Sequence, residues 1–271
     1  MNRLGIESIS VFGLGPVECV NLAADLGCAY ISTMLTPIDI NPHGYPKWSL
    51  RDDAALRREM IAALRDRGIA ISLGEGFTVR PGVEARDRAA DMDTMCELGA
   101  KRINSVSMDP DLRRSFDQFA ILAEMAATRG VEATLEFSPC LSVADLPTAL
   151  AAVRHVGRPN FRLLIDTMHL VRSGSGAADL AALDPKLIGY IQLADATLKP
   201  RIANYMQEAM TERMVPGTGE LPLRDILAAL PRHLGIGLEI PLHSEAVAGV
   251  SPKVRLGRCV DAARHLLAQL E

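Results

Sequence analysis

The chain has 271 residues, of which 48% are apolar and 23% are charged, and its formal net charge is -4. This balance is typical of a globular protein with a sizeable core and excludes a disordered chain. The sequence has no run of lysine and arginine residues, so nothing in it predicts a nucleic-acid partner. It also has no apolar stretch of about 18 residues and no signal-peptide pattern, so we expect a cytoplasmic protein that does not bind membranes.

Short apolar runs alternate with longer segments in which apolar residues recur at helical spacing, from one end of the chain to the other. The runs predict strands at residues 3–11, 29–34, 69–74, 102–107, 132–137, 161–166, 188–193 and 235–240. The longer segments predict helices at residues 16–26, 53–67, 83–98, 114–129, 143–155, 176–183, 221–230 and 254–269. Asp52 or Asp53 begins the second helix and Gly68 ends it, since carboxylates favour helix starts and glycine follows helix ends.

The eight strand–helix rounds predict a closed barrel. Strands that are apolar throughout indicate a parallel sheet covered on both faces, and eight such strands close a (β/α)8 TIM barrel. An open doubly wound sheet is the alternative, but no GxGxxG motif follows the first strand and no linker divides the chain. The sequence therefore predicts an α/β protein with one TIM-barrel domain over residues 1–271.

The last four predicted strands end on oxygen-bearing side chains, namely Glu136, Asp166, Gln192 and Glu239. In a TIM barrel these ends meet at one mouth, where the chemistry takes place. Three carboxylates so close together raise one another's pKa unless a cation neutralises them. An all-oxygen set without a thiolate favours Mg²⁺ or Mn²⁺. The pattern predicts one divalent metal ion, although a single carboxylate at a strand end is more often a helix cap.

Further polar and aromatic residues follow the predicted strands. His169 comes three residues after Asp166, so this pair either caps the next helical turn or faces the mouth. The residues predicted to bind substrate are His43, Glu75, Arg172, Arg213, Trp48 and Phe77. For the two arginines a solvated surface position is the equal alternative. Asp195 is expected to cap or support the site, or to replace Gln192 as a metal ligand.

Five stretches of the chain resemble the xylose-isomerase-like TIM barrels, a family that includes sugar phosphate isomerases and epimerases, hydroxypyruvate isomerase, tagatose-type 3-epimerases and 3-dehydroshikimate dehydratase. The stretches are "LEFSP", "LLIDTMHLVRSG", "GYIQLADA", "RMVPGTGELPL" and "GLEIP". The resemblance implies that one divalent metal is bound by Glu136, Asp166, Gln192 and Glu239. It also implies that His169 contacts the substrate. Many epimerases of the family have a histidine where this chain has Gln192, which favours a hydroxypyruvate-isomerase or dehydratase type of site.

The chemistry shared by this family is the removal of a proton from the carbon next to a carbonyl, with a metal stabilising the oxyanion that forms. In this interpretation Glu136 and Glu239 transfer the proton while touching the metal, and His169 is hydrogen-bonded to the substrate. We therefore predict a metal-dependent isomerase or epimerase of a small sugar or hydroxy-carbonyl compound. The expected partner is a small polyhydroxy or keto substrate, and a homo-oligomer is compatible with the sequence.

Two alternatives remain open at this point. The first is a metal-dependent lyase of the 3-dehydroshikimate dehydratase type, which a basic clamp for an anionic group at the mouth would favour. The candidates for that clamp are Arg80, Arg172, Arg201 and Arg213. The second alternative is a metabolite-binding barrel without catalysis. Clustered carboxylates argue against it, because without a metal they would only cost stability.

Overall fold

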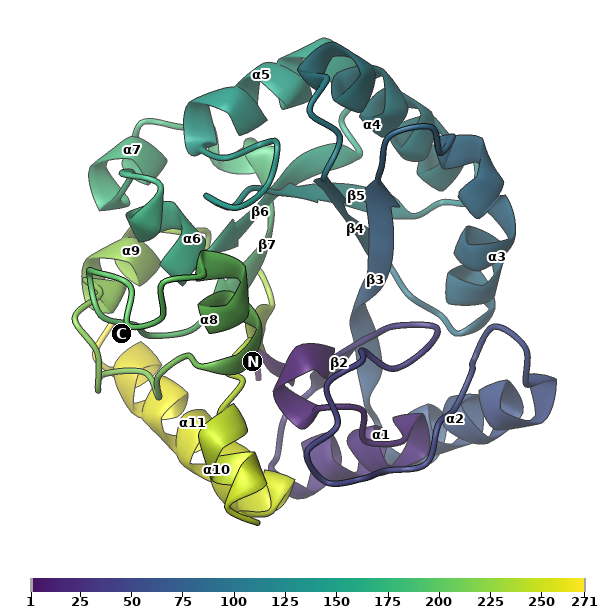
Figure 1. The fold of residues 1–271 in the computed structure, drawn as a ribbon, viewed down its shortest axis with the longest axis vertical. Helices are drawn as coiled ribbons and strands as arrows, with labels where there is room; N and C mark the ends of the chain where they lie inside the picture. The colour runs from purple at the N-terminus through teal and green to yellow at the C-terminus, as the bar shows by residue number, and fades with distance from the viewer. Residues whose placement is uncertain (1, 271) are drawn as a thin grey trace.

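Eight parallel strands form the centre of the protein in the computed structural model, which describes residues 2–270 (Figure 1). The strands are β1 Leu4–Ile6, β2 Tyr30–Thr33, β3 Ala70–Val79, β4 Arg102–Ser107, β5 Glu132–Glu136, β6 Phe161–Asp166, β7 Ile188–Leu193 and β8 Ile236–Leu238. Each strand pairs with its neighbours in sequence, and β8 pairs with β1, which closes the ring. The predicted TIM barrel is confirmed, while the two ends of the predicted domain, residues 1 and 271, lie outside the described residues.

Helices surround the ring of strands (Figure 1). The longer ones are α1 Pro16–Asp25, α2 Ala54–Arg67, α3 Ala89–Glu97, α4 Leu112–Ala127, α5 Leu146–Val156 and α11 Pro252–Ala268. The shorter ones are α6 Thr167–Arg172, α7 Ala177–Ala181, α8 Tyr205–Thr211, α9 Leu223–Ala229 and α10 His243–Val247. Three 3-10 turns, η1 Ser8–Val11, η2 Ala85–Arg88 and η3 Pro185–Leu187, join these elements. Within residues 2–270 no helix combines the length and the apolar character that crossing a bilayer requires.

The ends of α2 follow directly from the local sequence. The Asp53 carboxylate accepts hydrogen bonds from the backbone N–H groups of Ala55 and Leu56, which have no partner inside the helix. Gly68 follows the last turn with a φ of 66°, a left-handed conformation that glycine adopts without steric cost. Asp53 is therefore the N-cap of this helix, one of the two residues predicted for its start.

The first predicted strand, residues 3–11, is too long. The structure ends β1 at Ile6 and turns Ser8–Val11 into the 3-10 turn η1. The reason is the Ser10 hydroxyl, which donates to the carbonyl of Leu238 at 2.9 Å and accepts from the N–H of Ile240 at 2.8 Å. These bonds attach the turn to β8, so the segment crosses the barrel end instead of pairing as a strand.

The third strand is longer than its predicted range of 69–74 and reaches Val79. Its register against β4 shifts between Gly74 and Phe77, which marks a bulge. Gly76 lies in this bulge with a φ of 102°, a backbone conformation that a residue with a side chain adopts only at a cost in free energy. The bulge lets the strand continue past Gly74 and brings the side chains of Glu75 and Phe77 to the mouth of the barrel.

Leu73, Leu164 and Tyr190 form a small hydrophobic cluster that is separate from the large hydrophobic core. Because β3 lies across the ring from the neighbouring strands β6 and β7, this cluster fills the barrel interior. Above it the interior becomes polar, since the Tyr190 hydroxyl is hydrogen-bonded to Glu7 and to Ser72, each at 2.8 Å. Buried polar groups therefore support the mouth from below.

Candidate active site

A cavity of about 200 Å³ opens at the carboxyl-terminal end of the barrel. Its floor is polar and is formed by Glu75, Asn104, Glu136, His169, Arg213 and Glu239. These residues come from several strands and from the segments that follow them. This is the end of a TIM barrel at which active sites lie.

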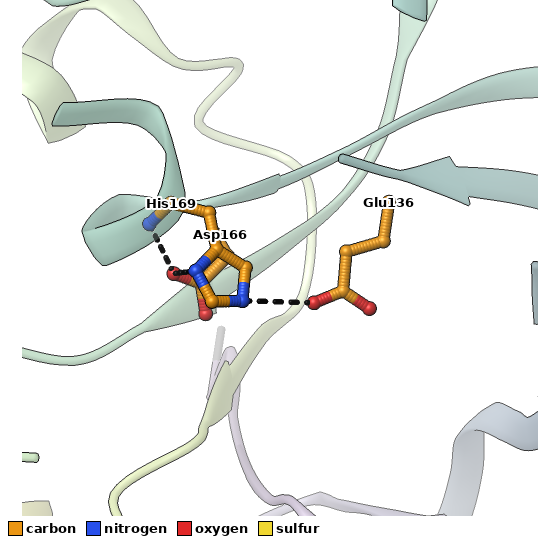
Figure 2. Close-up of side chains that lie close together, drawn as sticks. All are labelled: Glu136, Asp166 and His169. Atoms are coloured by element: carbon orange, nitrogen blue, oxygen red, sulfur yellow. Dashed lines mark hydrogen bonds and ion pairs between the residues drawn. The ribbon is translucent and has the colours of Figure 1, made fainter. Parts of the chain in front are cut away.

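Asp166 is the last residue of β6, and its two carboxylate oxygens contact different groups. Its Oδ1 accepts a hydrogen bond of 2.9 Å from the backbone N–H of His169, so it caps α6. Its Oδ2 lies 2.5 Å from Nη1 of Arg213. Figure 2 shows the His169 ring between Asp166 and Glu136, with Nε2 of the ring 3.5 Å from Glu136 Oε1. The pair of Asp166 and His169 thus both caps a helix and faces the site.

His169 is held as a neutral imidazole. Burial lowers its pKa to about 4, and the charge of Arg213 contributes in the same direction against the opposing effect of Asp166. Its Nδ1 lies 2.8 Å from the hydroxyl of Tyr205, whose own pKa burial raises. The phenol therefore keeps its proton and can donate it to Nδ1 when that ring nitrogen is the unprotonated one. We infer that Nε2 carries the imidazole proton and points it toward Glu136.

Arg213 lies between two carboxylates. Its Nη2 is 2.6 Å from Glu239 Oε2, an ion pair whose angles fall outside hydrogen-bond geometry, while Nη1 bonds Asp166. Burial alone would lower the pKa of Arg213, but Asp166 and Glu239 raise it above its ordinary value. Burial alone would likewise raise the pKa of Asp166, but Arg213 and His169 lower it to about 2. Arg213 and Asp166 are therefore both charged.

The other carboxyl groups of the floor hold protons more strongly than usual. Burial and the nearby Asp166 raise the pKa of Glu136 to about 7, and burial raises the pKa of Glu239 well above its usual range. The Asn104 amide donates to Glu136 at 2.6 Å and to Glu75 at 3.3 Å, and burial raises the pKa of Glu75 as well. The floor thus contains more acidic groups than the single charge of Arg213 neutralises.

Glu7 is a buried part of this site that the sequence analysis missed. It follows β1, its side chain is fully buried, and its Oε2 accepts a 3.3 Å hydrogen bond from Gln192 Nε2. The same Gln192 nitrogen donates to Glu239 Oε1 at 3.2 Å. The signal in the sequence that could have identified Glu7 is that it is a single glutamate within an apolar run. Because the first strand was expected to continue to residue 11, Glu7 stood in the middle of the strand instead of at its end.

The donors on the floor fit a divalent cation. Within residues 2–270, one ligand atom each from Glu136, Asp166 and His169 lies within 4.8 Å of the others. Gln192 Oε1 is buried without a hydrogen-bond partner, which leaves an oxygen available for a cation. This geometry adds His169 as a donor and does not group Glu239 with the three. The predicted ligand set of Glu136, Asp166, Gln192 and Glu239 stays a prediction.

Comparison with known proteins gives the family. Residues 20–258 match the xylose isomerase-like TIM barrel family. The chain belongs to this family. No curated protein matches the sequence.

Solved structures of the xylose isomerase-like fold superpose over nearly the whole chain. The IolI protein with a bound zinc atom has 18% identity and a TM-score of 0.82, with 99% of each chain covered. D-allulose 3-epimerase from Methylomonas sp. has 16% identity and a TM-score of 0.71, with 98% of each chain covered. A probable 3-DHS dehydratase from Bacillus anthracis has 15% identity and a TM-score of 0.71, over 94% of this chain and 99% of that one. At these identities the likeness shows the fold alone.

Of the residues predicted to bind substrate, this member of the xylose isomerase-like family brings Glu75, Phe77 and Arg213 to the cavity. Arg172 is not among the residues that line the cavity: its Nε donates to the carbonyl of Thr197 at 2.9 Å and its Nη2 lies 3.4 Å from the buried Glu208.

Two further predicted residues, Trp48 and His43, lie outside the cavity. The Trp48 indole donates to the carbonyl of Gly13 at 3.1 Å and lines a small apolar pocket that adjoins the cavity and shares Met34 and Ile38 with it. His43 Nε2 is 3.3 Å from Nη2 of Arg255. The substrate-binding roles of these two residues and of Arg172 stay predictions.

Asp195 anchors a loop. Its two carboxylate oxygens accept hydrogen bonds from the backbone N–H groups of Gly217, Gly219 and Leu221 at 2.8 to 3.2 Å. These bonds occupy both oxygens, so this xylose isomerase-like barrel uses Asp195 to hold residues 215–221 against the end of β7. This is the capping role that the sequence analysis considered for it.

We expect Gly237→Ala to disturb Glu7 and destabilise the protein by about 1–3 kcal/mol, the usual range for overpacking. A Cβ at position 237 would lie 1.6 Å from Glu7 Oε1, and Glu7 is enclosed by its hydrogen bonds. Urea denaturation measures the effect. Gly235→Ala is the matched control, because its nearest neighbour, Tyr190, would be 3.7 Å from the new Cβ. Equal stabilities of the two variants would contradict the expectation.

Proposed function

We propose that this protein is a metal-dependent isomerase or epimerase of a small hydroxy-carbonyl compound or sugar, acting by proton removal next to a carbonyl. The observation that carries the proposal is that two carboxyl groups, Glu136 of β5 and Glu239 after β8, face one cavity. Two such groups can remove a proton from one position and return it at another. Membership of the xylose isomerase-like family supports this reaction class.

The surrounding residues prepare the two carboxyl groups for this task. Asn104 holds the Glu136 carboxyl through the 2.6 Å hydrogen bond to Oε2, and Arg213 holds Glu239 through the ion pair. His169 presents its Nε2 proton beside Glu136, where it can donate a hydrogen bond to a substrate oxygen. Arg213 also lines the cavity, where its charge balances part of the negative charge of Asp166 and Glu239.

A divalent cation, when bound, supplies a Lewis acid that stabilises the enolate oxygen. Glu136 and Asp166 would hold it, together with Gln192 and Glu239, or with His169 in the tautomer that leaves Nε2 without a proton. Mn²⁺ or Mg²⁺ suits the oxygen donors, whereas His169 as a ligand would also suit Zn²⁺. Asp166 contributes a full negative charge to this set, because Arg213 and His169 keep its pKa at about 2.

A lyase of the 3-dehydroshikimate dehydratase type is the second candidate from the sequence, and it would need a cation for the carboxylate of its substrate. Of the four arginines considered for that clamp, Arg213 alone lines the cavity, and it is paired with Asp166 and Glu239. The observed site therefore favours isomerisation or epimerisation.

Solvent-deuterium incorporation tests the proposal. Protein loaded with Mn²⁺ is incubated in D2O with ketoses, hydroxypyruvate, dehydroshikimate and simple hydroxy-ketones, and NMR records the loss of the proton next to the carbonyl. We expect exchange with at least one compound and about one divalent ion per chain, lost in Asp166→Asn. The non-catalytic barrel would be favoured if the protein bound no metal, or if it bound a compound of the panel without exchanging the proton of any of them.

A further inference from the structure

The wall of the cavity above its charged floor is apolar. It is formed by Met34, Ile38, Phe77, Met108, Met206 and Met210. Met206 and Met210 are four residues apart on α8, so they lie on one face of this helix. In Figure 1, α8 lies inside the ring of outer helices, near the barrel mouth. Methionine side chains are flexible and polarisable, so this wall can pack closely against an apolar group of irregular shape.

The charges of the cavity do not suit an anionic substrate. Among its described lining residues there is no lysine, and Arg213 is the single arginine. Each of the three nitrogens of its guanidinium already has a partner, since Nε donates to the carbonyl of Ala209 at 2.9 Å and the other two face Asp166 and Glu239. A phosphate or carboxylate would meet the acidic side chains of the floor without a free cation of the chain.

The wall also offers few partners for hydroxyl groups. Its described hydroxyls belong to Ser8, Thr78 and Ser138, and the Ser138 hydroxyl lies 3.2 Å from the sulfur of Cys140 as a hydrogen-bond partner. A sugar with a hydroxyl on every carbon would bury several of them against methionine and phenylalanine side chains. A buried hydroxyl without a partner costs free energy, whereas an apolar group at the same place gains it.

We infer that the substrate is a small uncharged α-hydroxy carbonyl compound with an alkyl or aryl group, and that this group packs against Phe77, Met206 and Met210. The inference rests on the proposed function and narrows its substrate class. The hydroxy-carbonyl end lies on the floor, where the carbon–hydrogen bond breaks and its proton passes to Glu136 or Glu239. The electron pair forms the enolate. Return of the proton to the same carbon gives the epimer, and return to the former carbonyl carbon gives the isomer when the hydroxyl proton passes to the former carbonyl oxygen, so neither outcome needs a co-reactant.

Binding and exchange within one series of compounds test this inference. Calorimetry and deuterium exchange with Mn²⁺-loaded protein compare phenylacetylcarbinol and acetoin with dihydroxyacetone, fructose and fructose phosphate. We expect phenylacetylcarbinol to bind about tenfold or more tightly than dihydroxyacetone or fructose, because it buries more apolar surface. Equal or tighter binding of fructose or fructose phosphate overturns the inference, and exchange of those sugars leaves the proposed function standing. The absence of exchange with every compound overturns the proposed function itself.

Variants of the wall locate the apolar group. Met206→Gln keeps the length of the side chain and adds an amide, so we expect phenylacetylcarbinol to bind about tenfold more weakly and acetoin to bind almost unchanged. Met210→Gln tests the same face of α8, and thermal melting checks that each variant is folded. Val254→Gln is the control, because Val254 is an exposed residue of α11 outside the cavity. Unchanged affinity in both folded methionine variants overturns the inference.

Discussion

Replacing Arg213 with methionine is expected to lower the free energy of unfolding of the metal-free protein by about 3–5 kcal/mol at pH 7. The reason is that Asp166 and Glu239, both buried, lose the cation that lies between them. Guanidinium denaturation of the two proteins measures this difference. Arg201→Met is the control, since the Arg201 side chain is half-exposed and its Nε lies 3.9 Å from the Glu208 carboxylate.

The pH dependence of this difference has a defined sign. Arg213 and His169 hold the folded pKa of Asp166 at about 2, below the value of about 4 that an unfolded aspartate has. The stability from this depressed pKa is present above pH 4 and is lost as the pH falls toward 2. The wild type and Arg213→Met should therefore converge in acid. Mn²⁺ should stabilise the variant more than the wild type, and a difference below about 1 kcal/mol at pH 7 would contradict the role given to Arg213.

Glu136→Gln is expected to slow deuterium exchange by about 10²- to 10⁴-fold, the usual contribution of a general base. Glutamine keeps the shape of the side chain and an oxygen for Asn104, but it cannot take a proton. The exchange rate is measured on an active substrate, and the metal content is measured in the same samples. Glu132→Gln is the control, because Glu132 begins the same strand at the opposite end of the barrel.

The two measurements on Glu136→Gln separate two roles of this residue. Lost exchange with retained metal identifies Glu136 as the proton acceptor. Joint loss of exchange and metal identifies it as a ligand on which the site depends. An exchange rate equal to that of the wild type would remove Glu136 from the mechanism.

The fold could be predicted from the sequence because buried parallel strands have a clear sequence pattern, a short run of mostly apolar residues. In Phe161–Asp166 the residues from Leu163 to Ile165 are apolar and buried, and Asp166 after them shows where the strand reaches the mouth. The predicted length of the first strand was wrong, because hydrogen bonds of Ser10 to residues 228 and 230 positions away decide it. Local sequence patterns do not reveal contacts between residues so far apart in the chain.

The site could be predicted only in part. The strand ends identify Glu136, Asp166 and Glu239. The partner of an arginine, in contrast, depends on which distant segment of the chain folds back against it. Arg172 meets Glu208, a residue of α8 that is 36 positions away. The helix α8 has seven residues, too few for an apolar period to be recognised, so the methionine wall was not predicted.

The backbone around Arg213 has a consequence for how such a protein can change its substrate. The N–H of Arg213 donates to the carbonyl of Pro241, and the next residue, Met214, is paired with Asp195 in both directions. The charged groups are thereby fastened to the strand ends, whereas Met34 and Met206 belong to a loop and a short helix. If the proposed function holds, reaction type and substrate choice reside in separable parts of the chain. Loop exchange is the natural route to new substrates.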